Sequence, residues 1–393
     1  MFNLKQYDWK RYNFSLLIIM VILCICSAYF VSFAMTATAG EDSGSSYFKR
    51  QIISMFGGLL VAVIVSLIDY KRICDFAIIY YIIGTLMAAA TKLSPLGTDL
   101  KTGSYRWLKF PGFNFQPSEI CKIIIIIALA VFFTRMQDEM HSFKTLMIGF
   151  IIMIIPTAFI LIQSDLSSSI VIMFIFAMMI FAAGLSYKIV TPILCIGIPT
   201  VMGGIWFLQQ PLAKKIVPED HWYQIDRIIG FMNPEKYSNS FMFQQLHSIQ
   251  SIASGQLTGK LVNNDVSSGR SYSYVDVCES DFIFTVIGEE VGFIGCCVVI
   301  ALLCAIVFLC IRTAKHCNDT MGYLIAVGIS AMFMFQVFAN IGVATMLLPN
   351  TGLPLPFLSN GISSLMASSI AVGMVINIGL QPGTGDRSGI SFL

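Results

Sequence analysis

One apolar segment of this 393-residue chain carries carboxylates that need a chemical or structural reason to be there. In the stretch CESDFIFTVIGEEVGFIG, residues 278–295, Asp281 stands before the apolar run and Glu289 and Glu290 stand inside it. An isolated charge is strongly disfavoured in an apolar medium, so each carboxylate needs a cation, a proton or a catalytic role. Asp281 could act as a base on a substrate that is partly in water and partly in lipid, or it could simply cap a helix.

The same stretch has a helical pattern of small residues. One face of a helix would carry residues spaced by three or four positions: Asp281, Thr285, Gly288, Gly292 and Gly295. Such a face can pack closely against a neighbouring segment. Glu289 and Glu290 would point about 100° apart, and we expect at least one of them to pair with a cation or to stay protonated.

A second polar stretch, GSYRWLKFPGFNFQPSEICK, predicts the start of another helix. Pro117 suits the first helical position, and Glu119 then falls where a carboxylate meets the positive helix end. Glu119 and Lys122 share a helix face and could form an ion pair that fixes the helix entry. Alternatively they contribute to an anion or sugar site below Arg106 and Trp107, a pair that could also be an interfacial anchor.

The stretch LPNTGLPLPFLSNGISS, residues 348–364, predicts a proline-rigid loop that leads into the last apolar run. Ser359 or Asn360 could cap the helix that follows. The free backbone N–H groups at this helix start, together with Ser363 and Ser364, could form a phosphate-binding cradle.

The composition identifies the elements that must position these groups. Hydrophobic residues make up 56% of the chain and charged residues 12%, against about 25% charged residues in an average soluble domain. With a mean hydropathy of +0.78, the chain is predicted to be an all-α integral membrane protein. Its net charge of +2 gives no reason to expect nucleic-acid binding.

About twenty apolar residues cross a bilayer, and on that measure the chain is predicted to contain about ten transmembrane helices in a single domain. The spans are expected near 14–35, 51–68, 74–91, 118–134, 145–162, 166–184, 189–208, 282–311, 320–346 and 362–380, with one long extracellular loop at 209–281. Asp165 lies in the short turn between the fifth and sixth spans, where we interpret it as a helix cap.

The loop charges predict the orientation, because short cytoplasmic loops are enriched in Lys and Arg. With the N-terminus inside, the inner segments carry eleven such residues: Lys5, Lys10, Arg11, Lys71, Arg72, Arg135, Lys144, Lys188, Arg312, Lys315 and Arg387. The short outer loops carry six: Lys49, Arg50, Lys92, Lys101, Arg106 and Lys109. Both termini are therefore expected to be cytoplasmic, and the chemistry is expected at the outer face.

Other function classes lack their sequence signatures. No P-loop, dinucleotide fingerprint or zinc motif is present, so activation must arrive with the substrate or an ion gradient. Most of the eleven cysteines lie in or beside apolar segments, and neither a disulfide framework nor a cysteine-bound metal is expected.

Taken together, these motifs resemble the SEDS family of bacterial cell-wall proteins, which includes RodA, FtsW and SpoVE. The matching pieces are GSYRWLKFPGFNFQPSEICK, QSDLSSS, FQQLHSIQSIASGQLTGK, ESDFIFTVIGEEVGFIG and LPNTGLPLPFLSNGISS, which span roughly residues 100–380. The resemblance implies a ten-helix glycosyltransferase of the bacterial plasma membrane that polymerises lipid II into peptidoglycan, usually with a class B penicillin-binding protein as partner. The family serves cell shape, division or sporulation.

The resemblance also implies roles for individual residues. The catalytic aspartate of the family falls on Asp281, its tryptophan on Trp107, and its glutamate and lysine on Glu119 and Lys122. The chain lacks the histidine that usually precedes this aspartate. Lipid II brings its own pyrophosphate leaving group, which explains the absent ATP site.

We expect Asp281 to take the proton from the acceptor hydroxyl, with inversion at the donor sugar, and the charge on the leaving group to be balanced by Arg106, Lys122 and Arg270. A divalent cation, Mg²⁺ or Mn²⁺, is compatible with this chemistry, but no metal ligands can be assigned from the sequence.

Two alternatives use the same residues differently. A lipid II flippase would use the intramembrane carboxylates for transport, but it would need a polar path from the inner face, whereas the polar residues cluster in the outer half. A non-enzymatic scaffold for a transpeptidase would need only the helical surface. Membrane lipids are expected to surround the chain in each case.

Overall fold

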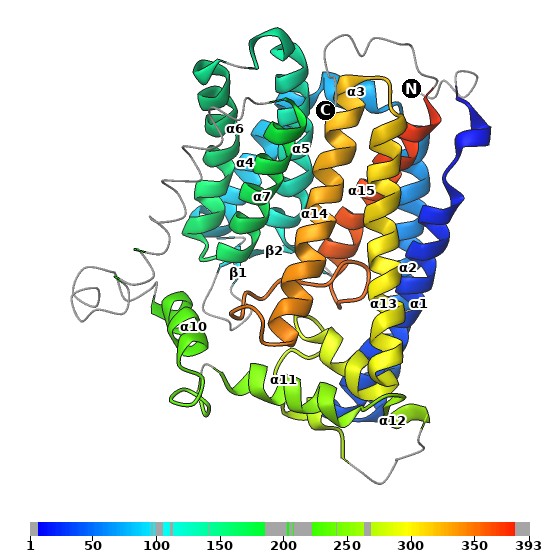
Figure 1. Ribbon diagram of the computed structural model, residues 1–393, viewed down its shortest axis with the longest axis vertical. Helices are drawn as coiled ribbons and strands as arrows, with labels where there is room; N and C mark the ends of the chain where they lie inside the picture. The colour runs from blue at the N-terminus through cyan, green and yellow to red at the C-terminus, as the bar shows by residue number, and fades with distance from the viewer. Residues whose placement is uncertain are drawn as a thin grey trace.

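The chain folds into a bundle of long helices, with a small sheet and part of the short helices at one end (Figure 1). The computed structural model describes residues 7–95, 97–98, 105–110, 113–140, 142–184, 203, 207, 222–240, 242–262 and 269–381. Within these residues the apolar helices pack around one continuous hydrophobic core. This is the architecture of an all-α membrane protein.

Nine of the ten predicted spans fall on helices. These are α1 (Phe14–Ala39), α2 (Glu41–Leu67), α4 (Ala77–Leu93), α5 (Pro117–Arg135), α6 (Phe143–Ile162), α7 (Leu166–Ala182), α13 (Ile283–His316), α14 (Thr320–Ala344) and α15 (Ile362–Leu380). Seven helical segments among the described residues are long and apolar enough to cross a membrane, and α4 and α7 are shorter apolar helices. The predicted span 189–208 lies outside the described residues except for positions 203 and 207, so the count of ten stays a prediction.

The shorter elements connect these helices. They are η2 (Trp9–Arg11), α3 (Tyr70–Asp75), η3 (Gln137–Glu139), α10 (Trp222–Met232), α11 (Phe243–Ser254), α12 (Gly259–Val262) and η5 (Ser271–Tyr274). The predicted long loop 209–281 therefore contains helices of its own over its described part.

The start of α2 differs from the prediction. The helix begins at Glu41, whereas hydropathy placed the span from residue 51. Glu41 and Asp42 lie in its first turn, where their negative charge interacts favourably with the positive end of the helix dipole. The same charges lower the local hydropathy, so a count of apolar residues misses this part of the helix. Gly40 alone separates α1 from α2, with a φ of +91° that few other residues adopt.

A three-stranded antiparallel sheet, which the sequence did not predict, precedes α5. Its strands are β1 (Gly97–Thr98), β2 (Trp107–Phe110) and β3 (Phe113–Phe115), in the order β1-β2-β3. Leu108 pairs with Gly97 on one side and with Phe115 on the other. The sheet fixes the position of Arg106 and Trp107 close to the start of α5.

Helix α13 is interrupted at Gly292, where φ is 65° and ψ is −165°. The turn before α12 fills the interruption: Phe293 donates its N–H to Gln256 O at 2.9 Å. A Cβ atom at Gly292 would lie 2.4 Å from Gly259 N, so the two backbones touch. Gly288 packs against the side chain of Ile252, and the two contacts confirm the predicted close packing at these two glycines.

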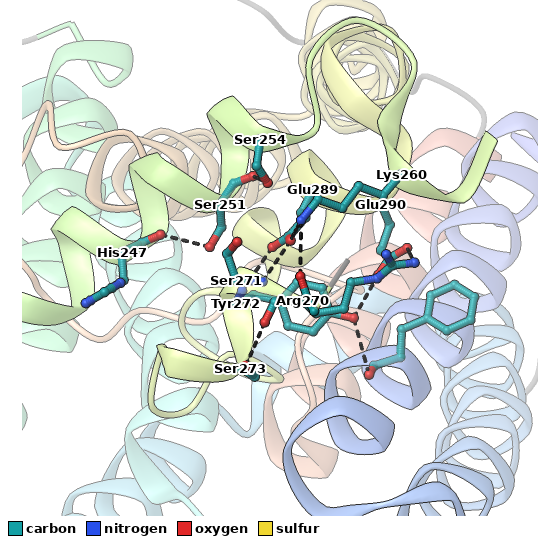
Figure 2. Close-up of polar contacts among 12 residues, drawn as sticks. His247, Ser251, Ser254, Lys260, Arg270, Ser271, Tyr272, Ser273, Glu289 and Glu290 are labelled. Atoms are coloured by element: carbon teal, nitrogen blue, oxygen red, sulfur yellow. Dashed lines mark hydrogen bonds and ion pairs between the residues drawn. The ribbon is translucent and has the colours of Figure 1, made fainter. Parts of the chain in front are cut away.

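Two ion pairs with buried glutamates hold α12 and the segment after it against α13 (Figure 2). Lys260 Nζ lies 2.5 Å from Glu289 Oε1, and Arg270 Nε lies 2.7 Å from Glu290 Oε1. Tyr272 donates its backbone N–H to Glu289 at 2.9 Å and its hydroxyl to Glu290 at 2.8 Å. Both glutamates therefore pair with a cation, which confirms the expectation for at least one of them.

The two ends of the described chain lie side by side, since Asp8 donates its N–H to Leu380 O at 3.0 Å. We call this end of the bundle the termini end. The sheet, α10, α11 and α12 lie at the opposite end, which we call the cavity end (Figure 1).

Candidate active site

A polar cavity of about 260 Å³ opens at the cavity end, lined by α10, the starts of α5 and α7, and the loops before α13 and α15. It collects five of the residues that the sequence nominated: Arg106, Trp107, Glu119, Asp281 and Ser364. These positions are up to 258 residues apart in the chain (364 − 106). The fold therefore joins three separate sequence motifs in one site.

Asp281 lies in the turn before α13, with its carboxylate in the cavity. The N-cap residue of α13 is Phe282, so the helix-cap interpretation of Asp281 is wrong. The carboxylate accepts one hydrogen bond within the described part of the chain, from Ser280 Oγ at 3.0 Å. Asn340 Nδ2 fixes the backbone by donating to Asp281 O at 2.8 Å and to Leu353 O at 2.7 Å.

The surroundings of Asp281 raise its pKa above the ordinary aspartate value. Desolvation by the surrounding protein is the main cause, although the residue keeps partial access to the cavity. The hydrogen bond from Ser280 and the charges of Arg227 and Arg106 oppose the increase, and Asp165 adds to it. A carboxylate with a raised pKa is a better proton acceptor than an exposed one.

The loop before α15 is fastened to the turn that carries Asp281. Ser359 Oγ donates to Ser280 O at 2.6 Å, and Asn360 donates its N–H to Glu279 O at 2.9 Å. The prediction that Ser359 or Asn360 caps α15 is wrong, because the N-cap is Gly361 and no side chain bonds there. Ser359 instead holds the Asp281 turn, a contact between segments far apart in sequence.

Gly352 brings this loop directly against the carboxylate. Its φ is +71°, and a Cβ atom there would lie 3.1 Å from Asp281 Oδ2. The same atom would lie 3.9 Å from Arg227 Nη1. Absence of a side chain at position 352 therefore lets the loop backbone approach both charged groups.

Two arginines flank the cavity. Arg106 Nη2 donates to Ser164 O at 2.5 Å, and Arg227 Nη1 donates to Asn350 O at 3.4 Å. Arg106 Nε is buried without a hydrogen-bond partner among the described residues. Sequence reasoning missed Arg227, since it lies in α10 without any motif; its only signal was a basic charge in the loop that also carries Asp281.

A smaller cavity of about 90 Å³ lies against the same two arginines. Its lining includes the apolar side chains Leu166, Ile170 and Ile228. The arginines thus stand between a polar chamber and an apolar one, an arrangement that suits a ligand with a charged group attached to a hydrocarbon chain.

The pair Glu119 and Lys122 forms a buried ion pair, with Lys122 Nζ 2.8 Å from Glu119 Oε1. Glu119 lines the cavity, whereas Lys122 is fully buried behind it. The ion-pair interpretation is therefore confirmed. Direct contact between Lys122 and a ligand in this cavity is not supported by its position.

The two serines at the start of α15 have different positions. Ser364 lines the cavity, as the phosphate-cradle hypothesis requires. Ser363 Oγ instead accepts from Gln116 N at 3.1 Å and donates to Asn114 O at 3.4 Å, which attaches α15 to the end of β3. Of the two serines predicted for the phosphate cradle, only Ser364 therefore lines the cavity.

Asp165 caps α7 as predicted, because its Oδ1 accepts from Ser168 N at 3.1 Å. Its Oδ2 accepts from the hydroxyls of Ser168 at 2.8 Å and Ser118 at 3.1 Å. The sequence did not indicate that this cap would also line the Asp281 cavity. Its negative charge is one reason why the pKa of Asp281 is raised.

Arg270, which the sequence nominated as a substrate cation, is not brought to this cavity. It pairs with Glu290 through two hydrogen bonds, at 2.7 and 3.1 Å, and lines a different surface pocket. The sequence alone does not reveal which cation pairs with Glu290. No group of three His, Cys, Asp or Glu side chains that could hold a metal ion occurs in the part of the chain that the structure describes.

Comparison with known proteins places these observations in a family context. Residues 10–382 match the family model of the cell cycle proteins FtsW, RodA and SpoVE. The probable peptidoglycan glycosyltransferase FtsW of Trichlorobacter lovleyi is 31% identical over 378 residues, 95% of this chain and 94% of that protein. Stage V sporulation protein E of Bacillus subtilis is 30% identical over 370 residues, covering 92% and 96%.

Solved structures share the fold. A chain from a peptidoglycan synthase complex that coordinates polymerization and crosslinking superposes with a TM-score of 0.73 at 22% identity, covering 95% of this chain and 97% of that one. The rod shape determining protein RodA of Thermus thermophilus gives a TM-score of 0.63 at 21% identity, covering 96% and 98%.

Proposed function

The chain belongs to the FtsW, RodA and SpoVE family of cell cycle proteins, and from this premise we propose that it is a peptidoglycan glycosyltransferase that uses Asp281 as its general base. The observation that carries the assignment of the base is the position of Asp281: a carboxylate of raised pKa, in a polar cavity, between two arginines. The substrate is lipid II, which supplies both the sugar acceptor and the activated sugar donor.

In the proposed reaction, Asp281 removes the proton from the 4-hydroxyl of an acceptor sugar. The hydroxyl oxygen attacks C1 of the donor sugar, and the bond from C1 to the pyrophosphate oxygen breaks with inversion at C1. The proton stays on Asp281 until solvent takes it, and the polyprenyl pyrophosphate leaves with the electron pair. General-base help of this kind accelerates a reaction roughly 10²–10⁴-fold.

The leaving pyrophosphate gains charge, which Arg106 and Arg227 are placed to balance. Both line the polar cavity and the smaller apolar one, so the pyrophosphate would lie between them and the first prenyl units beside Leu166 and Ile170. Trp107 and Ser364 are proposed to contact the sugars. No step of the proposal depends on the Mg²⁺ or Mn²⁺ that the sequence left open, and no protein ligands are assigned to such an ion.

The membrane setting follows from the same premise. The chain is a multi-pass membrane protein, and we place it in the bacterial plasma membrane with both termini in the cytoplasm. The cavity end then faces outward, where glycan strands are assembled. A class B penicillin-binding protein is the proposed partner, because the structural relative in the synthase complex couples polymerization to crosslinking.

Polymerisation of purified lipid II, with strands resolved on a gel, tests the proposal. Asp281→Asn should lower the rate by at least about 10²-fold, since it removes the base but keeps the shape. Asp42→Asn is the matched control, because Asp42 is an exposed aspartate in the first turn of α2, away from the cavity. Full activity of Asp281→Asn would exclude Asp281 as the base, and wild-type transport of labelled lipid II without polymerisation would favour a flippase.

A further inference from the structure

A second polar cavity, of about 430 Å³, lies at the termini end, far from Asp281. It is bordered by η2, the first turn of α1 and the last turns of α13 and α15, which meet at this end of the bundle (Figure 1). Its basic lining residues are Lys10, Arg11, Arg312 and His316. None of its lining residues contributes to the Asp281 cavity.

Among the residues that the structure describes, the lining of this cavity carries a net positive charge. No Asp or Glu is found among its described lining residues. Arg11 pairs with Asp8 at 3.2 Å, whereas Lys10 and Arg312 make no ion pair with any residue that the structure describes. The ends of α13 and α15 contribute roughly half a negative charge each, and the start of α1 contributes roughly half a positive charge. The two positive charges of Lys10 and Arg312 exceed this sum within the described part of the chain.

Residues typical of a membrane interface surround the cavity. Trp9 and Tyr12 stack at 6.3 Å beside it, and Trp9 is 48% exposed, as expected for an interfacial aromatic. The walls include the apolar side chains Leu309 and Ile378.

Exposed apolar side chains lead from this cavity along the two helices beside it. They are Phe14 and Ile18 of α1 and Phe308 and Ile311 of α13, and the two helices pack against each other. A polar, cationic chamber thus continues into a lipid-facing apolar surface.

We propose that this cavity binds the phosphodiester headgroup of an anionic phospholipid, with the acyl chains lying along α1 and α13. The cations supply the attraction for the phosphate, and each Lys or Arg near a membrane surface strengthens such binding about fivefold. The apolar side chains favour a lipid over a free phosphate, because a soluble anion would gain nothing from them. The proposal concerns a separate site and does not depend on polymerase activity.

Native mass spectrometry of the full-length protein in detergent tests this site. The protein is titrated with phosphatidylglycerol, with phosphatidylcholine or with glycerol phosphate. Lys10→Gln/Arg312→Gln should bind phosphatidylglycerol about twenty-five-fold more weakly than wild type. The matched control Lys71→Gln/Lys144→Gln removes two predicted inner-face charges whose positions lie outside the cavity, and it should bind like wild type.

Two further comparisons complete the test. Arg312→Lys restores the charge and should recover most of the binding that Arg312→Gln loses, which separates charge from disturbance of the fold. Equal binding of phosphatidylglycerol by the double variant and wild type would overturn the proposal. Tight, variant-sensitive binding of glycerol phosphate would overturn its lipid part, since the site would then take a free anion.

Discussion

At the scale of single residues, the site depends on how the surroundings of Asp281 set its proton affinity. Desolvation raises the pKa of this carboxyl, while the charges of Arg227 and Arg106 lower it. A higher pKa makes the carboxylate a stronger base, but the carboxylate then also becomes protonated, and therefore inactive, at a higher pH. The arginines therefore limit the increase in the pKa of Asp281 that desolvation causes.

Arg227→Gln should shift the pH dependence of polymerisation. Without this positive charge the pKa of Asp281 rises further, so activity is lost at a higher pH as the solution is acidified. The measurement is the rate at each pH relative to that variant's own maximum, which removes any general loss of rate. Arg72→Gln, an exposed arginine of α3, should leave the acidic limb unchanged. An unshifted limb in Arg227→Gln would show that Arg227 does not act on the base.

Gly352→Ala should impair catalysis more than stability. The added Cβ would lie 3.1 Å from Asp281 Oδ2, and alanine at a φ of +71° costs about 1 kcal/mol. Gly361→Ala is the matched control in the same cavity, because its φ of 176° is ordinary extended backbone and its Cβ would meet Ser364 Cβ at 3.7 Å. Rates and unfolding midpoints are measured for both variants, and equal rates would contradict the proposed crowding.

At the scale of elements, the interruption of α13 explains the two glutamates in its apolar run. The helix breaks at Gly292, the turn before α12 fills the break, and the ion pairs of Glu289 and Glu290 fasten the following segment. This segment leads through η5 to the turn that carries Asp281. The glutamates thus anchor the loop that delivers the base.

A double-mutant cycle should show that Arg270 acts through Glu290. Arg270→Gln leaves a buried carboxylate unpaired and should cost about 3 kcal/mol of unfolding free energy, whereas Arg270→Gln/Glu290→Gln should recover at least about 1 kcal/mol of it. Polymerisation should recover together with stability. If activity stayed lost in a stable double variant, Arg270 would have to contact the substrate after all.

At the scale of the whole molecule, the fold places two polar cavities at opposite ends of the helix bundle. The Asp281 cavity lies at the cavity end, and the cationic cavity lies at the termini end beside Asp8 and Leu380. The helices between them form the apolar layer. A polymerase with this arrangement meets its substrate headgroups on one side of the membrane only.

Cysteine labelling in intact cells tests that arrangement. Tyr274→Cys, at an exposed position near the Asp281 turn, should react with a membrane-impermeant maleimide from outside. Lys144→Cys, in the first turn of α6, should react only after the membrane is opened. Unmodified protein gives the background from the native cysteines. The reverse pattern would place the cavity end in the cytoplasm and exclude the proposed orientation.

Much of the fold and part of the site were determined by the sequence itself, because the relevant signals are local. Apolar runs predicted nine described helices, Pro117 and Asp165 marked helix starts, and the position of a carboxylate directly before an apolar run nominated Asp281. Each of these depends on the hydropathy or hydrogen bonding of residues within a few positions of one another.

Only the tertiary structure decided which charges meet. Arg227 reaches the cavity from α10, Arg270 turns to Glu290, and Lys122 is buried behind Glu119. The physical reason is that a charge in a low-dielectric interior must pair with a group that packing brings within a few ångströms, whatever its distance in sequence. Sequence shows that a carboxylate needs a partner, and only the fold selects the partner.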